Sequence, residues 1–292
     1  MPNNILVPNI ITKSSSIELS SNLNLNTISI ISNHYDKLAD IFITDLKYIE
    51  YNSDINQFAY TKLLKHMMKC NKDDAIMKIL GHVAEAVVVR RCNTSSIINK
   101  KWLDVAFIWR KYPDKFSEET IAIGTGLDYT KSNYKYFYKP QEPQFDIIWI
   151  NKETEKILLN ANDYYGDYIG LQVKTSGDGE KYIIKTLKNY KVPLIYFDIF
   201  NDFQKIAYKI QEMQKNEYIR KNLYGYFISA KEVDVDAYYE VCEYYKIIKK
   251  LYDNKISAED FINLGSQMNN LGSSVVKTIT EHIQIIENSI MV

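Results

Sequence analysis

The sequence predicts an α/β fold in which helices pack on a sheet, and three observations support this class. The runs QFDIIWI and YIGLQVKTS, at residues 144–150 and 168–176, have the apolar patterns of strands. KYIIKTLKNY then has helical spacing, and VPLIYFDIF is a continuous apolar run typical of a buried strand. A long apolar helix precedes them all. The order helix, strand, strand, helix, strand is typical of an α/β sandwich.

The composition is that of a folded protein with one large domain or two. Of the 292 residues, 46% are hydrophobic and 25% are charged, which is ordinary for a globular chain. The patterns divide the chain into an N-terminal arm with helices (1–72), an α/β core (73–230) and a C-terminal helical region (231–292). We expect the last region to pack on the core.

Cysteine, histidine and hydropathy patterns exclude several classes of protein. The three cysteines have no CxxC spacing and the four histidines form no HExxH pair, which excludes the common zinc motifs and favours a reducing compartment. No run of 18 apolar residues occurs, and the N-terminus lacks the pattern of a secretory signal. We therefore expect a cytoplasmic protein with no membrane association.

The first part of the chain predicts an arm and two amphipathic helices. Residues 1–33 are rich in Ser and Asn, as in an arm or an irregular first strand. Apolar residues then recur at helical spacing in YDKLADIFITDLKYIEY (35–51) and in FAYTKLLKHMMKC (58–70).

A third helix is predicted at 73–92, where two acids begin the sequence DDAIMKILGHVAEAVVVRRC. Apolar residues surround its second half, so we expect this helix to be buried. Glu85 lies in that half, where a carboxylate needs an ion partner or a metal because its desolvation is costly. His82 lies one turn earlier on the same face. Alternatively, Glu85 lies at the helix edge and pairs with a nearby basic residue or a tyrosine.

Basic residues are concentrated between residues 62 and 115, where twelve Lys and Arg face five acids. The net charge of the whole chain is zero, because the C-terminal part is acidic. A basic segment with interleaved aromatic residues could hold a phosphate backbone and stack on bases, although a solvated helical face is the commoner outcome. The candidates for nucleic-acid contact are Arg90, Arg91, Lys100 and Lys101, with Trp102, Trp109 and Tyr112 as aromatic neighbours.

The following segments complete the element order. IAIGTG (121–126) predicts a short strand that ends in a turn, since no phosphate-loop pattern accompanies the glycines. KSNYKYFYKPQEP (131–143) is rich in tyrosine, and its prolines stop regular structure before the central strand. A hairpin connection with a short strand at 156–160 joins the two central strands. Residues 202–215 predict a helix, 223–230 a strand, and the chain from 235 onward only helices.

Polar residues in the two central strands predict a metal site for phosphodiester chemistry. Because side chains alternate along a strand, Gln172 and Lys174 share one face of the second strand, and Asp146 shares a face of the first with its apolar neighbours. Mg²⁺ prefers oxygen ligands, which the Asp146 carboxylate, the Gln172 amide and the Val173 carbonyl could provide. Glu85 would add a second negative charge. Lys174 would orient or deprotonate the attacking water and stabilise developing charge.

This combination of Glu85 on a helix, Asp146 on a strand and Gln172-Val173-Lys174 on the next strand resembles the PD-(D/E)XK nuclease superfamily. The resemblance spans about residues 73–200 and implies a restriction-endonuclease-like αβββαβ core, here with additional N-terminal and C-terminal helices. It also implies cleavage of nucleic acid, usually DNA, with Mg²⁺ or Mn²⁺ as cofactor, and contact with nucleic acid at the strand exit, where Ser176 lies. The sequence departs from the commonest motif in having Gln172 where an acid is expected.

The leading hypothesis is therefore a Mg²⁺-dependent DNA endonuclease of the restriction or phage-defence kind, with RNA as an alternative substrate. Cleavage of both strands commonly needs two active sites, which a homodimer would provide. A second hypothesis is an inactive nucleic-acid-binding or protein-interaction module of the same fold, because Gln172 weakens the attraction for a cation. A third is a helical scaffold whose tyrosine-rich surface binds a partner protein.

Overall fold

A computed structural model describes residues 34, 37–52, 57–59, 71–141, 143–159, 169–177, 179–190, 192–216 and 223–253. The described chain is a mixed α/β structure built on a five-stranded sheet of order β3-β4-β5-β6-β7, and β1 and β2 form a separate two-stranded sheet. The predicted α/β class is confirmed. No described helix has the length and apolar composition needed to cross a membrane.

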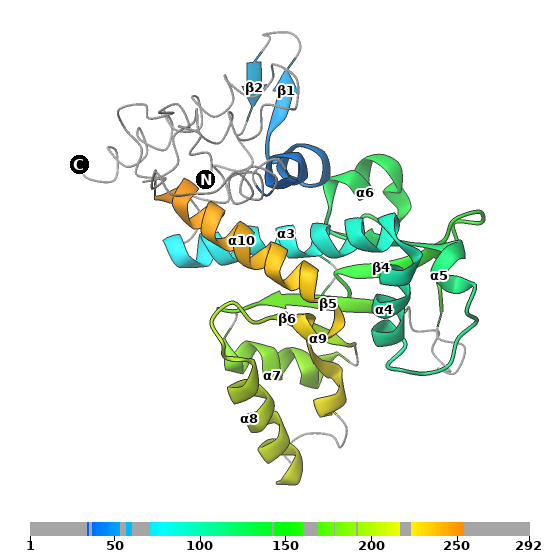
Figure 1. Cartoon of the computed structure of the whole chain (residues 1–292), viewed down its shortest axis with the longest axis vertical. Helices are drawn as coiled ribbons and strands as arrows, with labels where there is room; N and C mark the ends of the chain where they lie inside the picture. The colour runs from blue at the N-terminus through cyan, green and yellow to red at the C-terminus, as the bar shows by residue number, and fades with distance from the viewer. Residues whose placement is uncertain are drawn as a thin grey trace, which may run out of the picture.

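The helix α3 (Lys72–Thr94) is the longest described element and lies along one face of the sheet (Figure 1). It begins at the predicted place, where the side chain of Asn71 accepts a hydrogen bond from the N–H of Asp74. Its second half is buried, as its apolar sequence predicts. The helix α10 (Val235–Tyr252) crosses the same face beside it (Figure 1), so the described part of the C-terminal helical region packs on the core.

The sheet combines antiparallel and parallel pairs. The strands β3 (Thr120–Gly124), β4 (Ile147–Asn151) and the first residues of β5 (Gly170–Thr175) are antiparallel neighbours. The strands β6 (Leu194–Phe197) and β7 (Phe227–Ser229) then add in parallel to the other edge of β5. The parallel step requires a crossover, which α7 (Glu180–Asn189) provides between β5 and β6.

Two apolar layers enclose the sheet. On one face, α3, α10 and α4 (Ser96–Ala106) pack on side chains such as Trp149, Leu171 and Val173. On the other face, α7 and α8 (Phe203–Lys215) lie beside β6 (Figure 1) and pack on side chains of β6 and β7. The remaining elements are short: α5 (Phe116–Glu119), α6 (Asp128–Asn133), η2 (Lys135–Phe137), η3 (Leu223–Tyr226) and α9 (Ala230–Val233).

The N-terminal helices differ from the prediction. The first ends in the short π-helix η1 (Ile41–Asp45), because Lys47 adopts a positive φ of 44° that a helix cannot accommodate. The chain then forms β1 (Glu50–Asn52), which pairs with β2 (Gln57–Ala59) at the start of the second predicted helix. The rest of that helix, the arm at 1–33 and the helices expected beyond residue 253 lie outside the described residues.

Candidate functional site

The strand β5 changes partners in its middle, and the candidate site lies at that point. Only Gly170 and Leu171 pair with β4, whereas Gln172 to Thr175 pair with β6. The backbone of Asp146 continues the ladder by one step, since its N–H donates to the Leu171 carbonyl over 2.9 Å. Beyond it, the β4 side of β5 has no strand partner among the described residues, which leaves backbone groups available to side chains.

The Asp146 carboxylate binds one of these backbone groups. Its Oδ2 accepts a hydrogen bond of 2.7 Å from the Val173 N–H and lies 3.7 Å from the Lys174 ammonium. The Lys174 ammonium also lies 5.7 Å from the centre of the Tyr182 ring on α7. Strand alternation predicts the side-chain directions of Asp146, Gln172 and Lys174, and the structure brings the acid and the amine together.

Glu85 reaches the same region from α3. Its side chain is 6% exposed, and its Oε1 accepts a hydrogen bond of 3.2 Å from the Gly126 N–H. The neighbouring Thr125 N–H donates to the Asp146 carbonyl over 2.8 Å, so one turn binds both acidic residues. A Cβ atom at Gly124 would lie 2.6 Å from Glu85 Oε1, which means that the carboxylate requires a glycine there.

The turn at Gly124–Gly126 is predicted from the sequence only as the end of a strand, without a functional role. Its relation to Glu85 depends on the approach of α3, which no local pattern contains. The short helix α6 was also missed, although Asp128 in its first turn is a signal for a helix start.

The electrostatics of the two acids are linked. Burial raises the pKa of Glu85 well above its usual range, and the nearby Asp146 raises it further, while the Gly126 N–H and Lys174 oppose the shift. Burial also raises the pKa of Asp146, which Lys174 and the Val173 N–H partly offset. A buried and a partly buried carboxylate beside one amine would bind a divalent cation favourably, because the cation stabilises both charges.

Gln172 has a buried polar atom without a partner among the described residues. Its Nε2 donates to the Pro143 carbonyl over 3.0 Å, but its buried Oε1 has no hydrogen-bond partner among the described residues. A buried polar atom without a partner is costly and uncommon in folded proteins. The amide oxygen is therefore suited to accept an additional donor or to coordinate a hard cation.

The Val173 carbonyl faces the same region. The Gln172 N–H donates toward β6, to the Pro193 carbonyl, whereas the Val173 N–H donates in the opposite direction to Asp146. In an extended strand the N–H and C=O of one residue point the same way, so the Val173 carbonyl faces Asp146. Two carboxylates, an amide oxygen and a carbonyl oxygen form a donor set that fits Mg²⁺ or Mn²⁺. The described residues contain no group of three His, Cys, Asp or Glu side chains that could hold a metal.

His82 and Tyr48 form a further polar pair near Glu85. The Tyr48 hydroxyl is hydrogen-bonded to Nδ1 of His82, and Tyr48 is almost fully buried. Burial raises the pKa of Tyr48, and the charge of Glu85 raises it further. Tyr48 therefore remains a neutral phenol beside the candidate site.

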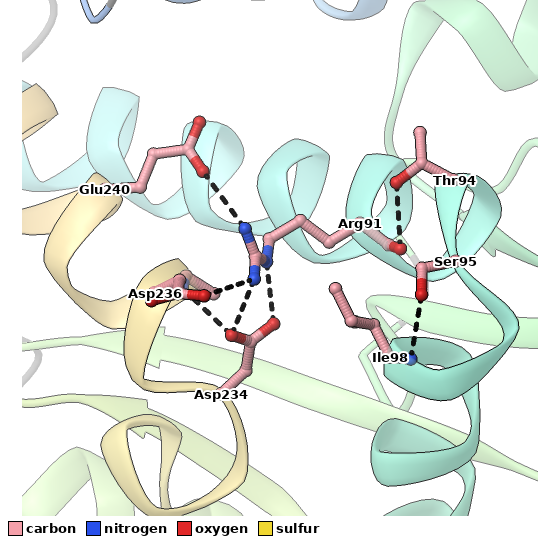
Figure 2. A network of polar contacts seen from close by, with 8 residues as sticks. Arg91, Thr94, Ser95, Ile98, Asp234, Asp236 and Glu240 are labelled. Atoms are coloured by element: carbon pink, nitrogen blue, oxygen red, sulfur yellow. Dashed lines mark hydrogen bonds and ion pairs between the residues drawn. The ribbon is translucent and has the colours of Figure 1, made fainter. Parts of the chain in front are cut away.

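Arg90 and Arg91, which we expected to contact nucleic acid, are engaged in ion pairs within the protein. Arg90 pairs with Asp40 and Asp45 near η1. Arg91 binds Asp234 through two hydrogen bonds of 2.7 and 2.9 Å and also approaches Asp236 and Glu240 (Figure 2). These pairs attach α3 to its neighbours, which gives both arginines a structural role in place of the predicted phosphate contacts.

The structure gives different surroundings to the other residues predicted to contact nucleic acid. Lys100 pairs with Asp114 over 3.3 Å, and Lys101 is exposed on the same helix, α4, which packs on the opposite face of the sheet from Lys174. Trp102 is fully buried and cannot stack on a base. Ser176 is also fully buried, where its hydroxyl donates to Asp202 and to the Phe197 carbonyl. The prediction for Ser176 and Trp102 is wrong because the packing of neighbouring elements covers both side chains.

Comparisons of this chain with protein-family models, with curated proteins and with solved structures find no match.

Proposed function

We propose that the protein is a metal-dependent nuclease with a restriction-endonuclease-like core, whose site is formed by Glu85, Asp146, Gln172 and Lys174. The observation that carries the proposal is the convergence of the buried Glu85 carboxylate, the partly buried Asp146 carboxylate and the Lys174 amine at the partner change of β5. The element order α3, β3, β4, β5, α7, β6 supports the αβββαβ assignment.

Each residue has a chemical role in this proposal. Asp146 and Glu85 would hold Mg²⁺ or Mn²⁺, together with the Val173 carbonyl and the Gln172 amide oxygen. A bound divalent cation supplies charge stabilisation and an acidified water for phosphodiester hydrolysis. Lys174, held beside Asp146 and the Tyr182 ring, orients the attacking water and stabilises negative charge on the phosphate. Burial of the acids strengthens these interactions because the local dielectric is low.

The test is cleavage of supercoiled plasmid, single-stranded circular DNA and labelled RNA with Mg²⁺ or Mn²⁺. Lys174→Ala and Asp146→Ala are expected to lower the cleavage rate by at least about 100-fold, the usual effect of losing acid–base or electrostatic catalysis. Lys185→Ala is a matched control, since Lys185 is exposed on α7. Circular dichroism verifies folding, and wild-type cleavage by either site variant contradicts the assignment.

The same assay addresses strand specificity and assembly. A monomer with one site produces nicked circles first, whereas a homodimer with two sites produces linear DNA directly. Light scattering at the assay concentration relates the product to the oligomeric state.

A second candidate function is an inactive nucleic-acid-binding module of the same fold. Gln172 favours it, because an amide replaces a carboxylate and lowers the negative charge available to a cation. This candidate predicts salt-sensitive binding without cleavage in either metal.

A further inference from the structure

The segment 128–139, which comprises α6, η2 and the two residues after η2, carries exposed basic and aromatic side chains close to the candidate site. Phe137 is buried against Ile123, Phe145 and Ile148, which fixes the segment to the sheet. Tyr136, the next residue toward the N-terminus, is 82% exposed. A ring so exposed beside a fixed neighbour is available for stacking by a ligand.

Two lysines of this segment have no acidic partner among the described residues. Lys131 and Lys135 are exposed, and neither forms an ion pair with a described carboxylate, although Lys131 lies 5.7 Å from the Tyr138 ring centre. The acid of the segment, Asp128, is buried. Lys47 adds a further positive charge, since its ammonium donates to the Ser132 hydroxyl over 3.1 Å. This differs from Arg90, Arg91 and Lys100, whose charges are balanced by acids.

Both ends of the segment are hydrogen-bonded to the candidate site. The Thr130 hydroxyl donates to the Gly124 carbonyl over 2.6 Å, and the Lys139 N–H donates to the Thr125 carbonyl over 2.8 Å. These are the residues that lie beside Glu85 and Asp146. The segment therefore lies directly beside the candidate site.

A hollow of about 530 Å³ lies beside Tyr136. Its lining combines apolar side chains with a lysine and a glutamate: Tyr136, Phe137, Glu155, Lys156, Ile157 and Leu159. Ile157 is paired with Ile150, four residues beyond Asp146 on the strand, a distance of about 13 Å. The lining residue Ile157 is therefore connected to Asp146 through β4.

We propose that the segment Lys131–Lys139 binds unpaired nucleotides of the substrate, with bases stacked on Tyr136 and phosphates held by Lys131 and Lys135. The inference rests on the proposed nuclease function, and it specifies the substrate as nucleic acid with a single-stranded region beside the scissile bond. Exposed aromatic rings interleaved with lysines are the usual means of binding single strands without sequence preference.

The test is fluorescence anisotropy with the full chain in EDTA, so that binding is measured without cleavage. The probes are a labelled 12-nucleotide oligo-dT and a labelled 12-base-pair duplex. Tyr136→Ala is expected to weaken oligo-dT binding by about 5- to 150-fold, the effect of removing one stacking platform, with little change for the duplex. Tyr208→Ala is the matched control, since Tyr208 is a 62% exposed tyrosine on α8.

The lysines are tested through the salt dependence of binding. The double variant Lys131→Ala and Lys135→Ala should reduce the slope of log K against log salt by about 1.4, because each phosphate contact contributes about 0.7. Replacing Lys100 and Lys101 should leave the slope unchanged. Wild-type affinity in Tyr136→Ala, or an equal loss for the duplex, overturns the inference. If the surface binds as expected but neither metal supports cleavage, the surface stands and only the nuclease assignment fails.

Discussion

Glu85 and Asp146 place two acids where water does not solvate them well, and this has a consequence for stability that depends on pH. The pKa of each carboxyl is raised in the folded protein, first by burial. Folding therefore favours the neutral form of each carboxyl. The resulting contribution to stability is fully present below the pKa that the carboxyl has in the unfolded chain. It is lost as the pH rises through the folded pKa. Without metal, the free energy of unfolding should therefore decrease as the pH rises from acidic to alkaline.

Glu85→Gln should remove much of this pH dependence. Glutamine keeps an oxygen for the Gly126 N–H but has no charge, so the variant in EDTA should be more stable than wild type at pH 8 by on the order of 1 kcal/mol, or about 2–4 °C in Tm. Differential scanning fluorimetry from pH 5 to 9 measures both proteins. Mn²⁺ at ten times Kd should stabilise wild type by about 1.4 kcal/mol and the variant much less. Parallel pH profiles of Tm would contradict the prediction.

Gln172→Glu should lower the stability of the metal-free protein and raise its affinity for metal. Glutamate cannot donate to the Pro143 carbonyl and adds negative charge beside Asp146, which should cost about 1–3 kcal/mol in EDTA. The same charge should increase Mn²⁺ affinity in titration calorimetry. Gln172→Met is the control, because it removes the amide without adding charge and should not gain affinity. Equal Mn²⁺ affinity of the glutamate variant and wild type would show that Gln172 does not face the cation.

At the scale of elements, the turn after β3 determines where α3 can place Glu85. A Cβ at Gly124 would lie 2.5 Å from Leu127 Cδ1 and 2.6 Å from Glu85 Oε1, whereas one at Gly126 would lie 3.6 Å from Glu85 Oε2. Gly124→Ala should therefore displace the carboxylate, lower stability by about 1–3 kcal/mol and reduce cleavage. In Gly126→Ala the added Cβ makes only an ordinary van der Waals contact, so this variant is the matched control. Chemical denaturation and the plasmid assay compare the two, and equal behaviour would refute this role of the turn.

At the scale of the whole molecule, the ion pairs of Arg91 join α3 to the start of α10. Asp234 is buried and binds Arg91 (Figure 2). It also accepts a hydrogen bond of 3.2 Å from the Ala237 N–H, whereas the side chain of Asp236 is 77% exposed. Burial alone would raise the pKa of Asp234, but the bonds from Arg91 hold it below its usual range. This stability is present at neutral pH and is lost as the pH falls through the folded pKa.

Asp234→Ala should destabilise the protein by about 3 kcal/mol, because it leaves a half-buried arginine and a helix start without their partner. Asp236→Ala should cost less than about 1 kcal/mol, since exposed pairs contribute little. Urea unfolding at pH 7 compares the two variants. The difference between them should shrink at pH 3, and a constant difference would show that the charge of Asp234 is not the cause.

The sequence was sufficient for features that depend on local periodicity. Strand alternation predicts that Asp146 and Lys174 converge, and the apolar surroundings of Glu85 indicate a buried acid. Features that depend on distant partners could not be predicted: Arg91 is paired with a residue 143 positions away, so it could not be distinguished from a free surface arginine. The end of the first helix was missed because apolar spacing continues to residue 51, although Lys47 adopts a left-handed backbone.

The hydrogen bond from the Val173 N–H to Asp146 also provides a built-in reporter of the site. The neighbouring Gln172 N–H donates to the Pro193 carbonyl, directly before β6, whereas the Val173 N–H donates to a side chain. Exchange at this one amide should therefore accelerate in Asp146→Ala while the rest of β5 remains slow. Mass spectrometry or NMR could then follow the carboxylate itself, in a protein that has neither substrate nor metal bound.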